Sequence, residues 1–167
     1  VAAGLGLAAA VLHLGAFGLD PLKDKGAEGL DTFQTDRVAR AVDEAEKFLS
    51  GMKDAILRAN DRALEARVDR FTTTARAMFR SIEGDPGDLT AARKYLSVYL
   101  MGARDATARF ADVYRTSRDA KARADYEALL NDLETNFASR TQALLSDNRT
   151  DLDIEIGVLR ERLQREG

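Results

Sequence analysis

The sequence predicts an all-α protein, an antiparallel bundle of three to four long amphipathic helices with an apolar helix at its N-terminus. Three observations support this fold. The 167 residues include only two prolines, and 45% are hydrophobic, which is enough for one continuous core. Apolar residues recur at steps of three and four over most of the chain. The breaks between these stretches are short, so consecutive helices are expected to lie antiparallel.

Residues 1–19 carry no formal charge, and Asp20-Pro21 follows them. An apolar run of about twenty residues can span the hydrocarbon core of a bilayer. We therefore expect a transmembrane helix at 1–19. A buried soluble helix and a signal-peptide remnant are the alternatives, although no basic segment precedes the run and no Ala-x-Ala site follows it.

Residues 20–32 are polar and contain Gly26 and Gly29, which predicts a linker. The helical bundle domain is then expected to occupy residues 33–167. Asn60-Asp61 marks a kink or a cap between its first two helical stretches. The first stretch has the apolar stripe Val38, Val42, Ala45, Leu49, Met52 and Ile56, and the second has Leu64, Val68, Phe71, Ala75, Met78 and Ile82.

The strongest break in the chain is Gly84-Asp85-Pro86-Gly87, after which Asp88 is expected to cap a new helix. This helix has a regular heptad seam, in which Tyr99 is expected to pack with its hydroxyl at the rim. The seam consists of Leu89, Ala92, Leu96, Tyr99, Ala103, Ala106, Phe110 and Val113.

The segment Thr116-Ser117-Arg118-Asp119 predicts a short turn, followed by one long helix that continues to about Arg165. The apolar spacing of this helix is closer to an eleven-residue repeat than to a heptad. Asn148 interrupts its stripe as a polar residue. The stripe consists of Tyr126, Leu130, Leu133, Phe137, Thr141, Leu144, Asn148, Leu152, Ile156, Leu159 and Leu163.

The residue inventory excludes several kinds of chemistry. Cysteine is absent, which rules out disulfides, thiolate metal sites and cysteine nucleophiles. The single histidine, His13, lies in the apolar run, so a Ser-His-Asp triad and a multi-histidine metal site are excluded. The net charge of -3 argues against a nucleic-acid binder. We therefore expect no catalytic, cofactor-binding or metal-binding residues.

Asp151, Asp153 and Glu155 resemble a metal or phosphatase signature, but they fall within helical periodicity. On a helix, Asp151 and Glu155 share a face while Asp153 points elsewhere. A calcium loop beginning at Asp147 would lack the glycine that its sixth position requires. We interpret these three carboxylates as a solvated helix surface.

Charge is distributed unevenly between two segments. Residues 53–80 are rich in arginine, and residues 125–155 are mainly acidic. Pairing between neighbouring helices of the bundle is the expected role of these charges, with each exposed pair contributing less than about 1 kcal/mol. The alternative is an arginine face that binds anionic lipid headgroups or phosphate.

Two runs of residues resemble the XpaC-like family of 5-bromo-4-chloroindolyl phosphate hydrolysis proteins. The first includes Asp85-Pro86-Gly87-Asp88-Leu89 and Ala92-Arg93-Lys94-Tyr95-Leu96, and the second includes Asp151-Leu152-Asp153-Ile154-Glu155-Ile156 and ends at Glu166-Gly167. The resemblance covers roughly residues 62–167. It implies a bacterial protein with hydrophobic N-terminal helices that associates with a TelA-type toxic-anion (tellurite) resistance partner. The family's name suggests a phosphatase, yet no catalytic motif transfers to this chain.

These observations together predict a membrane-tethered helical interaction module that acts in bacterial envelope or toxic-anion stress. Lys23 and Lys25 follow the apolar run, with Arg37 and Arg40 nearby. By the positive-inside rule, the bundle is expected to face the cytoplasm from the bacterial cytoplasmic membrane. The alternatives are a hydrolase of phosphate monoesters and a peripheral domain that binds anionic lipid.

Overall fold

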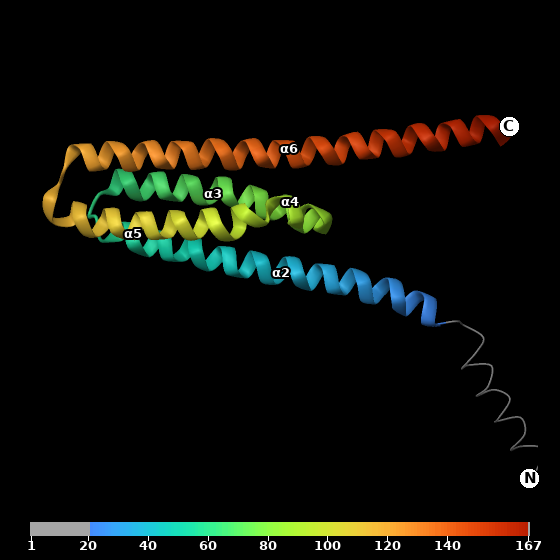
Figure 1. Cartoon of the computed structure of the whole chain (residues 1–167), viewed down its shortest axis with the longest axis horizontal. Helices are drawn as coiled ribbons and strands as arrows, with labels where there is room; N and C mark the ends of the chain where they lie inside the picture. The colour runs from blue at the N-terminus through green and yellow to red at the C-terminus, as the bar shows by residue number, and fades with distance from the viewer. Residues whose placement is uncertain (1–20, 167) are drawn as a thin grey trace, which may run out of the picture. The chain divides into compact units, whose positions relative to one another are not determined.

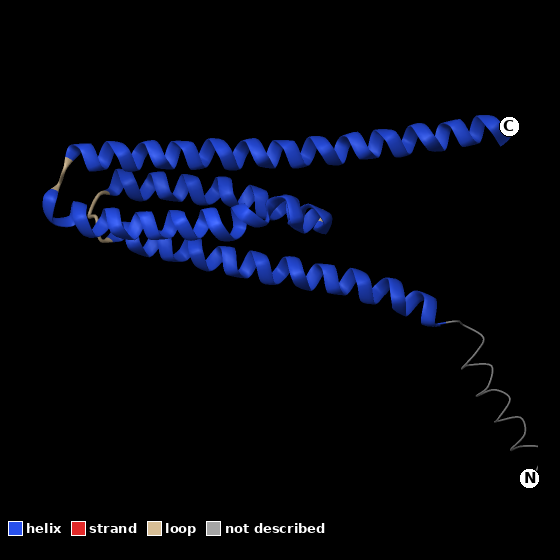
Figure 2. Ribbon diagram, viewed as in Figure 1, coloured by secondary structure: helices blue, strands red, loops and turns tan. Residues whose placement is uncertain are grey.

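The computed structural model describes residues 21–166, and in this part of the chain helices are joined by short loops, with no strand (Figure 2). The elements are α2 (Pro21–Leu57), α3 (Arg62–Gly84), the 3-10 turn η1 (Pro86–Asp88), α4 (Leu89–Lys94), the π-helix η2 (Tyr95–Tyr99), α5 (Leu100–Ser117) and α6 (Ala120–Glu166). The chain divides into two units, Val1–Asp36 and Arg37–Gly167. The core lies within the second unit, where α3, α5 and α6 run side by side (Figure 1).

The transmembrane helix expected at 1–19 lies outside the described residues. Among the described helices, none is both long and apolar enough to cross a membrane. Residues 21–32, which were expected to form a linker, are instead helical as the start of α2. Two glycines in a helix cost only about 1 kcal/mol each relative to alanine, and Pro21 occupies the first position, where proline is tolerated.

The apolar stripes predicted for the first two helices are confirmed. All six residues of each stripe are buried in the core. Between these helices, Asn60 adopts a left-handed backbone with φ 51°, which asparagine tolerates better than most residues. Asp61 then caps α3 by accepting a hydrogen bond from the Leu64 amide at 3.2 Å. The cap expected at Asn60-Asp61 is therefore present, and it starts a new helix.

The break at residues 84–87 is confirmed, and Asp88 occupies the N-cap position of α4 but does not cap it with its side chain. Asp85 has an extended backbone, and its carboxylate accepts a hydrogen bond from the Gly87 amide at 3.1 Å. Asp88 itself has helical backbone angles and makes no capping bond. The helix α4 begins at Leu89 as expected, but the 3-10 turn that starts at Pro86 leads into it without a break.

The heptad seam predicted for residues 89–113 is only partly correct. The seam residues that are buried as expected are Leu89, Ala92, Leu96, Ala103 and Phe110, whereas Tyr99 is 44% exposed and Val113 is 55% exposed. The residues Leu100, Thr107, Ala111 and Tyr114 are buried instead. The π-helix η2 explains the shift, because one turn of π-helix inserts an extra residue and rotates everything after it. Tyr95, which lies in this turn, packs against the core.

The turn at residues 116–119 and the single long C-terminal helix are both confirmed. Arg118 ends α5 in the left-handed region, and α6 then runs without interruption for 47 residues. Phe137 is the centre of its buried face and is fully buried. Its ring makes edge-to-face contacts with Phe71 at 5.2 Å and with Tyr95 at 5.1 Å between centroids.

A buried polar pair joins α5 to α6. The Thr107 hydroxyl donates to the Ala103 carbonyl at 2.7 Å, so its oxygen accepts the proton of the Tyr126 hydroxyl at 2.8 Å. The Tyr126 ring also stacks on Phe110 at 4.4 Å. Burial raises the pKa of Tyr126 to about 12, although the hydrogen bond with Thr107 opposes the shift.

We expect the stability of the protein to fall as the pH rises from about 10 to about 12. The folded state retains the Tyr126 proton over this range while the unfolded state loses it, so folding stability is complete below pH 10 and declines above it. The decline should approach about 1.4 kcal/mol per pH unit relative to Tyr126→Phe. Urea unfolding of both proteins at pH 8, 10 and 11 measures this difference. If the free energies of unfolding of the wild type and of Tyr126→Phe changed equally with pH, Tyr126 would not titrate as described.

Candidate interaction surface

The C-terminal part of α6, residues 149–166, extends beyond the ends of α3 and α4 (Figure 1). Leu144 is the last buried residue of the helix at 4% exposure. Every residue from 149 to 166 is exposed. The long helix was predicted correctly, and its apolar stripe is buried only as far as Leu144. The reason is length, because α3 and α5 have only 23 and 18 residues with which to cover the 47 of α6.

We call Leu152, Ile156, Leu159 and Leu163 the α6 stripe. These side chains are 55%, 46%, 58% and 62% exposed. Their spacing of four, three and four places them on one face of the helix, which is the spacing of a coiled-coil seam. An isolated helix of this length is marginal in water, and exposed apolar faces of this kind mark interaction sites. The α6 stripe therefore has the properties of a docking surface.

The charges beside the α6 stripe change sign along the helix. Asp151, Asp153 and Glu155 precede its centre, and Arg160 and Arg162 follow it. The segment is helical as expected, so the three carboxylates are spread around the helix surface rather than gathered. Within the described part of the chain, no cluster of acidic or histidine side chains is arranged to hold a metal ion.

A polar contact marks the point where α6 leaves the bundle. The Asn148 side-chain amide donates to the Asp88 carboxylate at 3.0 Å. Burial raises the pKa of Asp88, the bond from Asn148 opposes this, and the nearby carboxylates of Asp85, Asp147 and Asp151 raise it further. The polar break foreseen in the stripe therefore lies where α6 makes its last contact with the α4 end of the bundle.

A second candidate site is a hollow of about 320 Å³ beside α2 and the α4–η2 segment. It is lined by Arg37, Arg40, Ala41, Glu44, Leu89, Arg93, Leu96 and Ser97. Three arginines could attract an anion there, but Glu44 lies among them. The Ser97 hydroxyl donates to the Arg93 carbonyl at 2.8 Å. Sequence patterns could not have revealed this hollow, because its residues come from segments about fifty positions apart.

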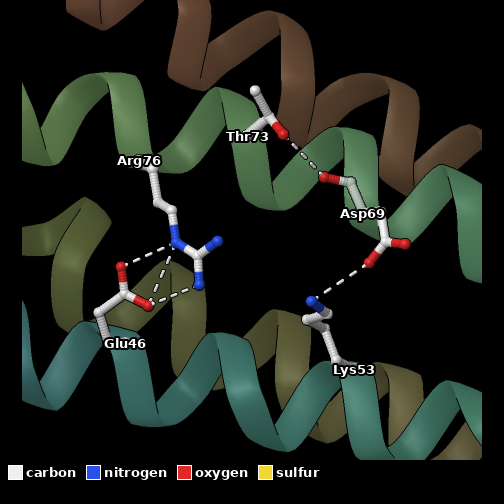
Figure 3. A network of polar contacts seen from close by, with 5 residues as sticks. All are labelled: Glu46, Lys53, Asp69, Thr73 and Arg76. Atoms are coloured by element: carbon white, nitrogen blue, oxygen red, sulfur yellow. Dashed lines mark hydrogen bonds and ion pairs between the residues drawn. The ribbon is translucent and has the colours of Figure 1, made fainter.

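Ion pairs connect α3 to helices on two sides. Figure 3 shows Arg76 bonded to Glu46 of α2, with a shortest distance of 2.9 Å, and Lys53 of α2 at 3.4 Å from Asp69. Arg70 pairs with Glu134 of α6 at 3.1 Å. The pairing expected between neighbouring helices is confirmed at these positions. Because Arg70 and Arg76 face different neighbours, they do not form a single basic face.

Over residues 1–159, the chain matches the family of 5-bromo-4-chloroindolyl phosphate hydrolysis proteins. It belongs to this family. The resemblance seen in the sequence is thereby confirmed, and the match extends to the N-terminal residues as well. No curated protein and no solved structure matches the chain.

The family's name refers to hydrolysis of a phosphate ester. This reaction requires a nucleophile or a positioned water, and groups that stabilise charge on the phosphoryl oxygens. The basic hollow offers arginines for the second role. Its one hydroxyl, on Ser97, already donates its proton to a backbone carbonyl. The carboxylates best placed in sequence, Asp151 and Asp153, lie on the exposed end of α6.

Proposed function

We propose that this protein is a membrane-tethered helical interaction module that acts in bacterial envelope or toxic-anion (tellurite) stress. The exposed α6 stripe is the observation that carries the proposal. It presents four large apolar side chains at coiled-coil spacing on a helix that extends past the core. Such a surface suits a partner with a matching amphipathic helix.

The setting of the module rests on the sequence. The uncharged run at residues 1–19 is long enough for a membrane tether, and Lys23 and Lys25 follow it. This arrangement supports a place in the bacterial cytoplasmic membrane with the bundle facing the cytoplasm. The proposed partner is a TelA-type toxic-anion resistance protein.

The partner proposal predicts that Leu152→Ser combined with Leu159→Ser abolishes function without unfolding the bundle. Both side chains lie outside the core, so the substitutions remove docking surface only. In cells that lack the protein, the wild type should restore tellurite tolerance and co-purify with the TelA-type protein. The double variant should do neither. The matched control is Val98→Ser with Val113→Ser, which are 61% and 55% exposed but lie elsewhere. Full activity of the stripe variant in both assays would refute the proposal.

The family description favours a second function, hydrolysis of phosphate monoesters. We expect the purified domain, residues 27–167, not to turn over a chromogenic phosphate. Its arginines could bind substrate, but equal binding of substrate and transition state does not lower the barrier to the chemical step. The assay is run with magnesium, manganese or zinc, and again with chelator. Metal-dependent turnover that is lost in Asp151→Asn with Asp153→Asn would establish the hydrolase instead.

A further inference from the structure

We propose that the α6 stripe is covered by the same stripe of a second copy of this chain, packed antiparallel. The inference rests on the proposed function in one respect, namely that the α6 stripe is a docking surface. It adds the immediate occupant of the α6 stripe and the register of the pairing, and the TelA-type protein is then a partner of the paired chains.

The apolar residues of the α6 stripe are complementary to themselves. In heptad terms, Ile156 and Leu163 are a positions, while Leu152 and Leu159 are d positions. In an antiparallel coiled coil, an a residue of one helix packs in the same layer as a d residue of the other. A two-fold axis between residues 157 and 158 pairs Leu152 with Leu163 of the second copy and Ile156 with Leu159. Every residue of the α6 stripe then has an apolar partner.

The flanking charges select the antiparallel direction. Asp153 and Arg160 are e positions, and Glu155 and Arg162 are g positions. Antiparallel helices bring e opposite e and g opposite g, so Asp153 meets Arg160 of the second copy and Glu155 meets Arg162. By symmetry this gives four pairs of opposite charge. In a parallel dimer, each g residue lies opposite the e residue five positions later in the other helix. This arrangement pairs Glu155 with Arg160, but it leaves Asp153 and Arg162 without an opposite charge.

The same charges argue against a membrane surface as the occupant. Helices that lie on anionic lipid carry lysine or arginine beside their apolar face. Here Asp151, Asp153 and Glu155 flank the first half of the α6 stripe and are exposed. A helix with acidic and basic halves is instead matched by a reversed copy of itself.

The absence of cysteine from the chain permits a direct test of register. Two differently tagged full-length chains, one carrying Leu152→Cys and the other Leu163→Cys, are mixed in mild detergent and oxidised. We expect a mixed disulfide between the two chains. Leu163→Cys alone should not form a disulfide, because the two-fold axis separates its copies by eleven residues, or roughly 16 Å along the helix. Disulfides need Cα atoms within about 7 Å. Val113→Cys on α5 is the matched exposed control.

A second arm tests the charges. Asp153→Arg should weaken self-association about tenfold or more, because it places two like charges opposite each other in each of two symmetric sites. Adding Arg160→Asp to the same chain should restore the association, since the pair is then exchanged rather than broken. Sedimentation of the full-length proteins at matched concentrations measures both effects.

Each other outcome overturns the inference in a recognisable way. A disulfide of Leu163→Cys with itself, without the mixed product, would show parallel pairing. No more disulfide than the Val113→Cys control, together with monomeric sedimentation, would show that no second copy covers the α6 stripe. If the Leu152→Ser, Leu159→Ser variant nevertheless abolishes function in cells, the α6 stripe is still a docking surface, but a second copy of the chain is not what binds it. If that variant is fully active, the docking role itself fails.

Discussion

Leu100→Ala is expected to lower the free energy of unfolding by about 2–5 kcal/mol, because Leu100 is 1% exposed and its loss leaves a cavity in the core. Tyr99→Ala should cost about 1 kcal/mol or less. The Tyr99 side chain is 44% exposed, and its main contact is the edge-to-face one with Tyr95 at 4.9 Å. Urea unfolding of the two variants measures this contrast directly. The opposite ranking would mean that the uninterrupted heptad is correct and that the π-helix does not shift the face of α5.

Phe137→Ala is expected to cost about 3–5 kcal/mol, because a fully buried aromatic ring is removed from the core. Phe137 joins α6 to both α3 and η2 through its ring contacts with Phe71 and Tyr95. The matched control is Leu145→Ala, on the same helix but 49% exposed, which should change stability by less than about 1 kcal/mol. Thermal and urea unfolding give the two values. Equal effects at Phe137 and Leu145 would contradict the position assigned to α6 against the rest of the bundle.

Local pattern was sufficient to predict the buried stripes of α2 and α3 and the breaks between helices, although it did not predict the start of α2 at Pro21. The buried residues of α2 and α3 repeat at helical spacing with no irregularity, so the stripe could be read directly from the sequence. Asp61 was identifiable as a cap because aspartate before an apolar-periodic stretch commonly fills that role. In such segments, the helix and its buried face can be predicted without knowledge of the neighbouring elements.

Local pattern failed where the structure depends on neighbouring elements. The π-helix at Tyr95–Tyr99 shifts the buried face from Tyr99 to Leu100, although the heptad continues without error in the sequence. Both seams contain apolar residues at acceptable spacing, so periodicity could not choose between them. Tyr95 lies in the π-helical turn, where it contacts Phe137 and packs against the core. Contacts of this kind between helices determine which of the two seams is buried.

The candidate site was visible in the sequence only in part. The residues of the α6 stripe were identified as part of one apolar stripe, but their spacing alone does not distinguish a buried stripe from an exposed one. The signals that they lie outside were the polar Asn148 and the excess length of the helix over its neighbours. The basic hollow had no comparable signal, since Arg37 and Arg93 come together only in the folded bundle.

The most direct test of the central claim, that the end of α6 works as a covered docking surface, is the rate of maleimide labelling of Leu159→Cys in native membranes. The rate is compared with that of Val113→Cys, first in those membranes and then in dilute purified protein. We predict similar rates for the two cysteines when the protein is dilute, because both positions are exposed in a single chain. In native membranes, Leu159→Cys should react at least about tenfold more slowly than Val113→Cys, as expected if a partner covers it in most molecules. Equal rates in the membranes would contradict the account.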